Sequence, residues 1–251
     1  MIYAIIYLGV EKMQNTKENV EPLYQISVTC PNCNYEYKTS KVRRSFVKTI
    51  KTDSDFCVHY KDINPDFYLV RICPMCGYAF TENFKSNVKP HVKERIYEII
   101  TKKWQNINYG NERNINDAIK LYKLSLLCAQ LTEESNAVIG GICFKLACLY
   151  RFKEDDEQER RFLQFTLDSY MSFFENESNV NVNEGKMLYL IGEIHRRLGD
   201  YHTAVKWFNR VVNEKSVTDI GIIKKAREQW QITKEQLHEN ENQSKNNIEN
   251  I

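Results

Sequence analysis

The sequence predicts an α+β protein, in which a small β-rich N-terminal domain is followed by an array of α-helical hairpins. Three observations predict this class. Two CPxC turns each follow a short run of β-branched and aromatic residues. After Pro90, apolar residues recur three and four positions apart with almost no proline. One of the resulting hairpins, at 188–208, carries small and aromatic positions typical of a helical repeat.

The first segment, residues 1–20, is predicted to be an unstructured lead or the product of a mis-assigned start codon, because a second methionine stands at Met13. Residues 2–10 are apolar but too few to span a bilayer, and they lack the basic flank and cleavage site of a signal peptide. Without export, the eight cysteines do not indicate a disulfide framework. We therefore expect a cytoplasmic protein with no membrane partner.

The second segment, residues 21–90, contains the turns Cys30-Pro31-Asn32-Cys33 and Cys73-Pro74-Met75-Cys76, separated by 39 residues. Two thiolates three positions apart can bind one ion, and two such turns complete a tetrahedral shell of four sulfurs. A redox-active CxxC opens a helix, whereas both of these turns close strands. The sequence thus predicts a zinc-knuckle domain, in which one structural Zn²⁺ is bound by Cys30, Cys33, Cys73 and Cys76.

The spacing of the knuckles is wider than the roughly 15–20 residues usual in small zinc ribbons, so a hairpin or insertion is expected between them. A second candidate site lies there, formed by Asp53, Asp55, Cys57 and His59. On an extended strand these four side chains share one face, which would suit a metal or a catalytic site. Alternatively, the aspartates cap turns and pair with Arg43, Arg44 or Arg71, while Cys57 and His59 pack or lie near the zinc. We favour this interpretation because the cluster lacks a Gly-rich loop, an activated Ser and a second matched carboxylate pair.

The same segment contains a basic stretch, residues 38–51, with six Lys or Arg residues and no acid. With the aromatic residues around it, this stretch could bind single-stranded nucleic acid through phosphate contacts and stacking. The alternative is a solvated strand whose charges prevent edge-to-edge pairing. We favour the second interpretation, since residues 21–90 hold ten Lys and Arg against seven Asp and Glu, an excess of three.

The third segment, residues 91–238, is predicted to be helical, and the polar residues 239–251 are predicted to be disordered. The apolar periodicity predicts helices at 91–105, 115–131, 137–152, 157–176, 184–198, 201–214 and 218–238. Cys128, Cys143 and Cys148 fall on the apolar faces of these helices, so we expect them to be buried.

The hairpin at 188–208 resembles a tetratricopeptide repeat, and two weaker copies precede it at irregular spacing. Gly192 and Ala204 are expected to face each other across the helix pair. Four residues lie off the apolar stripe of the first helix, where side chains would line a concave surface. These candidates for binding a partner are Tyr189, Glu193, Arg196 and Arg197.

The motifs of residues 30–84, taken together, resemble a bacterial family known as domain of unknown function 2225. The matching positions are Cys30, Pro31, Cys33, Asp53, Asp55, Phe56, Tyr60, Asn64, Pro65, Tyr68, Cys73, Pro74, Cys76, Gly77, Tyr78 and Ala79. Asn34 departs from the family pattern, in which glycine often follows the first knuckle. The resemblance covers most of residues 30–250 and implies a knuckle domain followed by tetratricopeptide-like helices, but it implies no activity.

Three functions follow from these features. The first is a non-enzymatic adaptor, stabilised by zinc, that binds a protein or peptide through its helices. The second is a regulatory zinc protein associated with nucleic acid through residues 38–51. The third is an enzyme with its site at Asp53, Asp55, Cys57 and His59. We favour the adaptor and assign no catalytic residue, because four knuckle sulfurs close the zinc shell and leave no position for an activated water.

Overall fold

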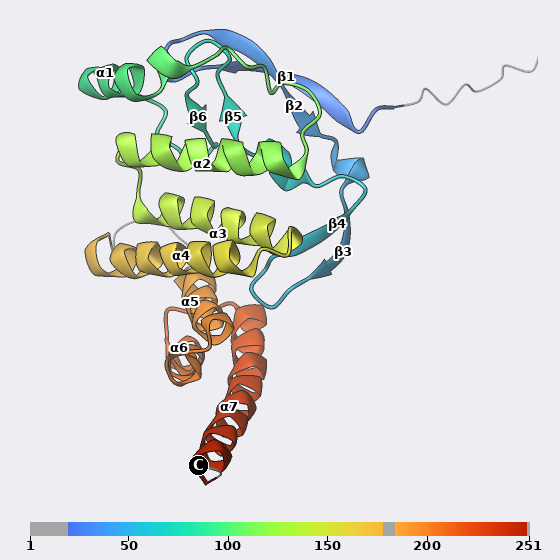
Figure 1. The fold of residues 1–251 in the computed structure, drawn as a ribbon, viewed down its shortest axis with the longest axis vertical. Coiled ribbons are helices and arrows are strands. Elements are labelled where there is room, and N and C mark those ends of the chain that lie inside the picture. Colours follow the sequence, from blue (N-terminus) through green and yellow to red (C-terminus); the bar gives the residue numbers. More distant parts are fainter. Residues whose placement is uncertain (1–19, 178–183, 250–251) are drawn as a thin grey trace, which may run out of the picture.

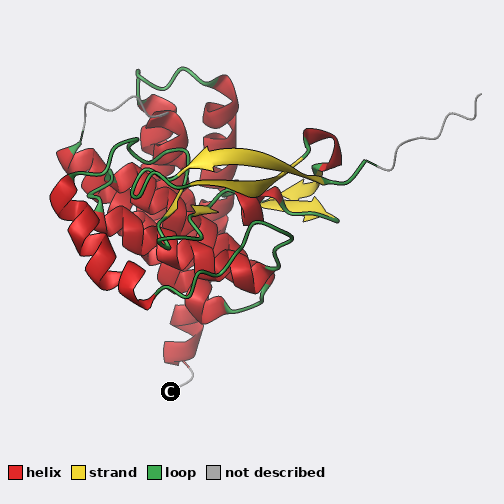
Figure 2. Cartoon of the chain, turned by 90° about the horizontal axis from the view of Figure 1, so that it is seen from above, coloured by secondary structure: helices red, strands yellow, loops and turns green. Residues whose placement is uncertain are grey.

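The computed structural model describes residues 20–177 and 184–249, and it confirms the predicted α+β class. Residues 1–19, which include almost all of the predicted lead, lie outside the described part. In Figure 1 the strands lie above and beside a stack of helices, and Figure 2 shows the longest strands on one side of the helical body. No helix in the described ranges is both long and apolar enough to cross a bilayer.

The described strands form three antiparallel pairs, β1–β2, β3–β4 and β5–β6. Their bounds are β1 Leu23–Thr29, β2 Glu36–Val42, β3 Lys48–Thr52, β4 Val58–Lys61, β5 Arg71–Ile72 and β6 Ala79–Phe80. The first knuckle joins β1 to β2, and the second joins β5 to β6. The β3–β4 hairpin between them is the insertion that the wide spacing of the knuckles predicts. In Figure 1 it extends away from the other strands and along the side of the helices.

Seven α-helices follow the strands in the described part of the chain. Their bounds are α1 Pro90–Ile99, α2 Ile115–Leu131, α3 Asn136–Phe152, α4 Asp156–Asn176, α5 Glu184–Leu198, α6 Tyr201–Asn213 and α7 Ile220–Glu249. Side chains cap several helix starts, as in the capping box of Asn114 and Asp117 on α2. Helices α2, α3 and α4 lie one below another, with α5, α6 and α7 beneath them (Figure 1).

The helix boundaries agree closely with those expected from the apolar periodicity, except at the two ends of the array. The first helix is shorter than predicted, because α1 gives way after Ile99 to a 3₁₀ turn at residues 101–103. The last helix is longer, because α7 continues through the polar residues 239–249 that we expected to be disordered. Adding residues to an existing helix costs far less than starting one, and Glu, Gln and Lys have high helix propensity.

One apolar cluster runs from the knuckle strands into the helices and includes Val70, Tyr78, Ile96 and Leu146. A second cluster joins α5, α6 and α7 around Phe208. Because strands and helices share the first cluster, the segments 21–90 and 91–238 pack against each other as parts of one body. The division into separate domains at residue 90 remains a prediction.

Gly192 lies where α5 approaches α6, as the repeat pattern predicts. A Cβ atom at Gly192 would stand 3.0 Å from the ring of Phe208, so the glycine allows the two helices to pack closely. The α6 side chain nearest to Gly192 is therefore that of Phe208 and not that of Ala204, which lies one helical turn before Phe208. Ala204 is itself fully buried.

Candidate metal centre and acidic junction

The two knuckles fold in the same way. In the first, the backbone N–H of Cys30 donates to the carbonyl of Tyr35 at 3.0 Å, and that of Asn34 donates to the carbonyl of Cys30 at 2.9 Å. In the second, Cys73 and Tyr78 make the equivalent 3.0 Å bond, and Gly77 donates to Cys73 at 2.9 Å. Each turn thereby holds its two thiols on the same side of the backbone.

The fifth residue of each knuckle has a left-handed backbone conformation. Gly77 has a φ of +72° and Asn34 a φ of +60°. Asparagine tolerates this region better than other residues with a side chain, so the departure from the family pattern at Asn34 leaves the turn intact. A Cβ atom at Gly77 would also stand 2.7 Å from the ring of Trp104, which packs over the second knuckle.

The four knuckle cysteines, which we call the knuckle cluster, come together as the sequence predicts. Their sulfur atoms all lie within 4.8 Å of one another, with Cys30 Sγ 3.7 Å from Cys76 Sγ and Cys33 Sγ 3.6 Å from Cys73 Sγ. These separations are much longer than a disulfide bond of about 2.0 Å, and no cysteine in the described part is in a disulfide. The knuckle cluster can therefore hold a metal ion.

Polar contacts surround the knuckle cluster, and those between its thiols shift their pKa values in opposite directions. Asn32 Nδ2 lies 3.5 Å from Cys76 Sγ as a donor, and Trp104 Nε1 donates to the carbonyl of Pro74 at 2.8 Å. Hydrogen bonding with Cys30 lowers the pKa of the Cys73 thiol to about 4, and the same contact raises the pKa of Cys30. Cys30 thus retains its proton while Cys73 ionises. Binding of a metal would release the proton of Cys30.

The second candidate site lies in the turn between β3 and β4. Asp53, Cys57 and His59 each offer one ligand atom, and these atoms lie within 4.8 Å of one another. Asp53 Oδ2 is 2.8 Å from His59 Nε2, and Cys57 is almost completely buried. The fourth predicted member, Asp55, is fully buried and binds arginines, so the structure brings three of the four side chains together as potential metal ligands.

Two arginines from the helices neutralise the acids of this turn. Arg151 of α3 donates from Nη1 to Asp53 Oδ2 at 2.9 Å and from Nη2 to Asp55 Oδ2 at 2.5 Å. Arg197 of α5 lies 3.3 Å from the same Asp55 oxygen, and both arginines also contact Glu159. We call these five residues the arginine junction. They show that the aspartates pair with arginines, although with different ones from those the sequence suggested.

The electrostatics of the arginine junction favour its ion-paired state. Burial opposes ionisation of Asp53, but hydrogen bonds from His59, Arg151 and Lys51 lower its pKa to about 2. Burial is the largest single effect on Arg151 and disfavours its charged form, but the hydrogen bond to Asp55 together with the charges of Asp55, Cys57 and Cys148 outweighs burial and raises the pKa of Arg151. Lys51 lies 3.2 Å from Asp53, so Arg151, Arg197 and Lys51 together match the charges of Asp53, Asp55 and Glu159.

The four predicted partner-binding residues lie next to this junction and make contacts within the chain. Tyr189 is buried, and its hydroxyl donates to the carbonyl of Ser54 at 2.9 Å. Glu193 is fully buried and accepts from the hydroxyl of Ser54 and from the guanidinium of Arg196. Arg196 and Arg197 border a cavity of about 390 Å³ between α4 and α5. Their role in binding a partner remains a prediction.

The remaining sequence candidates are placed as follows. Cys128, Cys143 and Cys148 are buried, as expected, and burial raises the pKa of each thiol. The six cations of residues 38–51 are all exposed. One of them, Arg43, lies over the ring of Tyr24 and donates to the carbonyl of Glu21.

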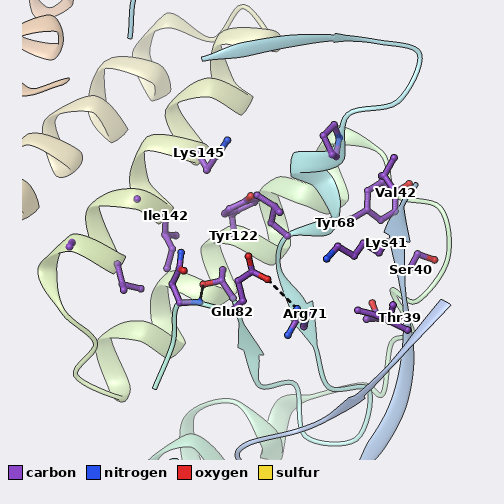
Figure 3. Close-up of a pocket in the computed structure, with 18 of the residues that line it drawn as sticks. Thr39, Ser40, Lys41, Val42, Tyr68, Arg71, Glu82, Tyr122, Ile142 and Lys145 are labelled. Atoms are coloured by element: carbon purple, nitrogen blue, oxygen red, sulfur yellow. Dashed lines mark hydrogen bonds and ion pairs between the residues drawn. The ribbon is translucent and has the colours of Figure 1, made fainter. Parts of the chain in front are cut away.

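A large groove lies between the strands and the helices, and no pattern in the sequence predicts it. Its volume is about 770 Å³, and it is bounded by β2, the 3₁₀ turn Pro65–Tyr68, residues 81–83 and the first half of α3. Figure 3 shows Lys41 and Arg71 across the groove from Ile142 and Lys145 of α3. This groove is larger than the cavity of about 390 Å³ between α4 and α5.

Sequence reasoning also missed two cations, one on α3 and one just before α2, that contact residues between the knuckles. Lys145 Nζ lies 2.6 Å from Asp66 Oδ2, and Arg113 donates to the carbonyls of Phe67 and Val70 and to Thr39. The available signal was that Lys145 and Arg151 interrupt an otherwise apolar helix. Cations in such positions need buried partners, and the aspartates between the knuckles are acids in need of a cation.

Comparison with known proteins bears on the family and not on the activity. The model of a family described as "Uncharacterized protein conserved in bacteria (DUF2225)" matches residues 23–233. A search of the curated proteins and a search of the solved structures each give no match.

Proposed function

We propose that this chain, which belongs to the bacterial family of domain of unknown function 2225, is a non-enzymatic adaptor. In this proposal zinc joins the two knuckles, and the groove between strands and helices receives a protein or peptide partner. The groove is the observation that carries the proposal. Its volume of about 770 Å³ is comparable to the roughly 300–1,000 Å³ of pockets that bury a small molecule, which is room for a few side chains of a peptide.

The donor chemistry of the knuckle cluster favours zinc. Four thiolates at the corners of a tetrahedron with Zn–S bonds of about 2.3 Å lie about 3.8 Å apart, close to the 3.6 and 3.7 Å separations of the sulfur atoms. Such a closed shell supplies folding stability and no bound water for chemistry. Reduced thiols also favour the cytoplasm as the location.

The arginine junction supports the same proposal indirectly. Its carboxylates are paired with Arg151 and Arg197, so neither Asp53 nor Asp55 is a free base, and Cys57 is closed to solvent. These contacts link the β3–β4 turn to α3 and α5 and help to fix the strands against the helices. These contacts give the acidic residues of the turn a structural role, so no catalytic role is needed to explain them.

A variant that fills the groove tests the proposal. Gly141 lines the groove and a Cβ atom there would meet nothing within 4 Å, so Gly141→Trp adds bulk to the groove. Tagged wild-type and Gly141→Trp proteins would be recovered from the native host, and co-purifying proteins quantified by mass spectrometry. We expect at least one protein to be recovered with the wild type and lost with the variant. Gln164→Trp, which adds the same bulk on the exposed side of α4, should retain it.

The same experiment separates the competing functions. The two tryptophan variants should have the same zinc content and melting temperature. Such a result would show that Gly141→Trp loses the partner without losing the fold. Capture that survives Gly141→Trp but is abolished by nuclease would favour the exposed cations of residues 38–51 and a nucleic-acid partner. Arg196 and Arg197 also pair with the buried Glu193 and Asp55, so the melting temperature of their double variant would be measured as well. Partner recovery that survives Gly141→Trp and is lost on substituting Arg196 and Arg197, with no fall in melting temperature, would move the binding site to the cavity between α4 and α5.

A further inference from the structure

The walls of the groove are mainly apolar. Its aliphatic and aromatic side chains come from strands, the 3₁₀ turn and helices, and they are Ile26, Val42, Tyr68, Leu69, Tyr122, Val138 and Ile142. Leu69 is exposed in the groove, whereas Val42, Tyr68 and Ile142 are buried at the edges of the groove. A partner that enters would therefore bury apolar side chains of its own.

Positive charge is concentrated around these walls. Lys41 of β2, Arg71 of β5 and Lys145 of α3 line the groove, and Glu82 is the one acid among the described lining residues. Arg71 contacts Glu82 weakly, at 3.5 Å, and the Glu82 side chain is 68% exposed. Lys145 is paired with Asp66, whereas Lys41 has no ion pair within the described part of the chain. Figure 3 shows Lys41 directed into the groove.

A glycine on α3 widens the groove. Glycine inside a helix costs about 1 kcal/mol relative to alanine, so its presence there usually has a packing reason. Gly140 has one, because a Cβ atom would stand 2.4 Å from the ring of Tyr170. Gly141 has none within the chain, since a Cβ atom there would meet open space. Because Gly141 has no side chain, the backbone of a partner has room to approach α3.

We infer that the groove binds an extended peptide segment of a partner protein, in which aliphatic side chains lie next to Asp or Glu. The aliphatic side chains would fill the space beside Gly141 and Ile142, and the carboxylates would meet Lys41 and Arg71. This inference rests on the proposed adaptor function and adds the chemistry of the partner. Nucleic acid fits the groove less well, because apolar side chains and Glu82 would face its phosphates.

Selection from a random peptide library tests this chemistry without a known partner. The zinc-loaded full chain would be immobilised and exposed to phage that display random octapeptides, in parallel with the Gly141→Trp and Lys41→Glu variants. We expect the wild type to enrich peptides in which Asp and Glu exceed Lys and Arg severalfold and accompany Leu, Ile or Val. These peptides should not be enriched by Gly141→Trp.

Affinity measurements then test how much the charge of Lys41 contributes to peptide binding. Binding of the most enriched peptide, labelled with fluorescein, would be followed by anisotropy. We expect Lys41→Glu to weaken it about tenfold, and added salt to weaken binding to the wild type more than binding to the variant. The matched control is Lys48→Glu, which reverses a charge on the exposed strand β3 outside the groove and should leave the affinity within about twofold.

The outcomes separate this inference from the proposed function. Enriched peptides that depend on Gly141 but lack acidic residues would overturn the inference and leave the adaptor proposal standing. Equal weakening by Lys41→Glu and Lys48→Glu would also overturn it, because the charge effect would then be general. Peptides that bind Gly141→Trp as well as the wild type would exclude the groove as their site, and recovery of proteins from the host would then decide the adaptor proposal alone.

Discussion

The knuckle cluster and the arginine junction both join parts of the chain distant in sequence, yet they differ in how charge is balanced. In the described part of the chain, the side-chain hydrogen bonds of the knuckle sulfur atoms are with Asn32 and with the other knuckle thiols. The carboxylates of the arginine junction contact Arg151 and Arg197 directly. The first cluster can therefore hold a metal cation, whereas the second already contains two cations of the chain.

This difference shows what identifies a metal site in a chain of this kind. Asp53 of the arginine junction also belongs to the group Asp53, Cys57 and His59, whose ligand atoms lie within 4.8 Å of one another, as those of the knuckle cluster do. Proximity of donors therefore does not distinguish the two groups. The charge that the protein itself places beside the donors decides whether an ion is required, because an anionic cluster is stable in the interior only when it is compensated.

The largest expected effect is that of removing one sulfur from the knuckle cluster. The free energy of zinc binding at structural sites, roughly 10–16 kcal/mol, is also folding free energy. Cys73→Ser should therefore abolish tight zinc binding and unfold the strands of residues 21–90, as measured by metal analysis and by circular dichroism. Cys143→Ala, which removes a buried thiol elsewhere, should keep one equivalent of zinc. Wild-type protein with less than about half an equivalent under reducing conditions would contradict the prediction.

The next effect is expected at the arginine junction and should leave zinc in place. Arg151→Met leaves Asp55 buried with Arg197 as its remaining cation, and breaking a buried pair in this way costs about 3–5 kcal/mol. Urea denaturation would measure the loss, and Arg160→Met on the exposed side of α4 is the control. Adding Asp55→Asn to Arg151→Met should recover part of the loss. Equal stability of the Arg151→Met and Arg160→Met variants would show that the junction does not hold the strands to the helices.

A smaller effect is expected for Asp53, which is partly exposed. Because its pKa in the folded protein is lowered to about 2, the charged form stabilises the fold above pH 4, and this contribution is lost as the pH falls toward 2. Measured at pH 7, Asp53→Asn should cost about 1–2 kcal/mol. Lys51→Ala, which removes an exposed contact of the same carboxylate, should cost under about 0.5 kcal/mol. A loss for Asp53→Asn as small as that for Lys51→Ala would remove Asp53 from the junction.

The smallest expected effect concerns zinc at the second cluster. If its charge is already balanced, titration of the metal-free protein with zinc should show one tight equivalent, and His59→Ala should leave that value unchanged. Competition with a chromogenic chelator would measure both. A second tight equivalent that is lost in His59→Ala would break the comparison and establish Asp53, Cys57 and His59 as a metal site.

The predictable parts of the molecule are those encoded by local pattern. The bounds of α2, α3 and α4 follow from apolar periodicity and from capping residues such as Asn114, and the knuckle ligands follow from the spacing of cysteines in two tight turns. In both cases the residues that determine the structure are close together in the sequence, or they repeat a motif that has one common solution.

The parts that were missed depend on contacts between distant segments. The sequence suggested Arg43, Arg44 or Arg71 as partners of the aspartates because they are near in the chain, but the partners are on α3 and α5. The groove could not be predicted either, since its walls come from separate elements and its depth depends on the missing side chain of Gly141. Pairing across such distances is not encoded in any local window of sequence.

The bond between Ser54 and Glu193 joins residues 139 positions apart, and it implies an order of events on the ribosome. All four knuckle cysteines have been synthesised by residue 76, whereas Glu193 is added much later. At roughly 5–20 residues per second, this interval lasts about 6–23 s. A nascent chain would thus be able to take up its metal while the turn at residues 53–57 still waits for α5, so zinc supply would act on the earliest step of maturation.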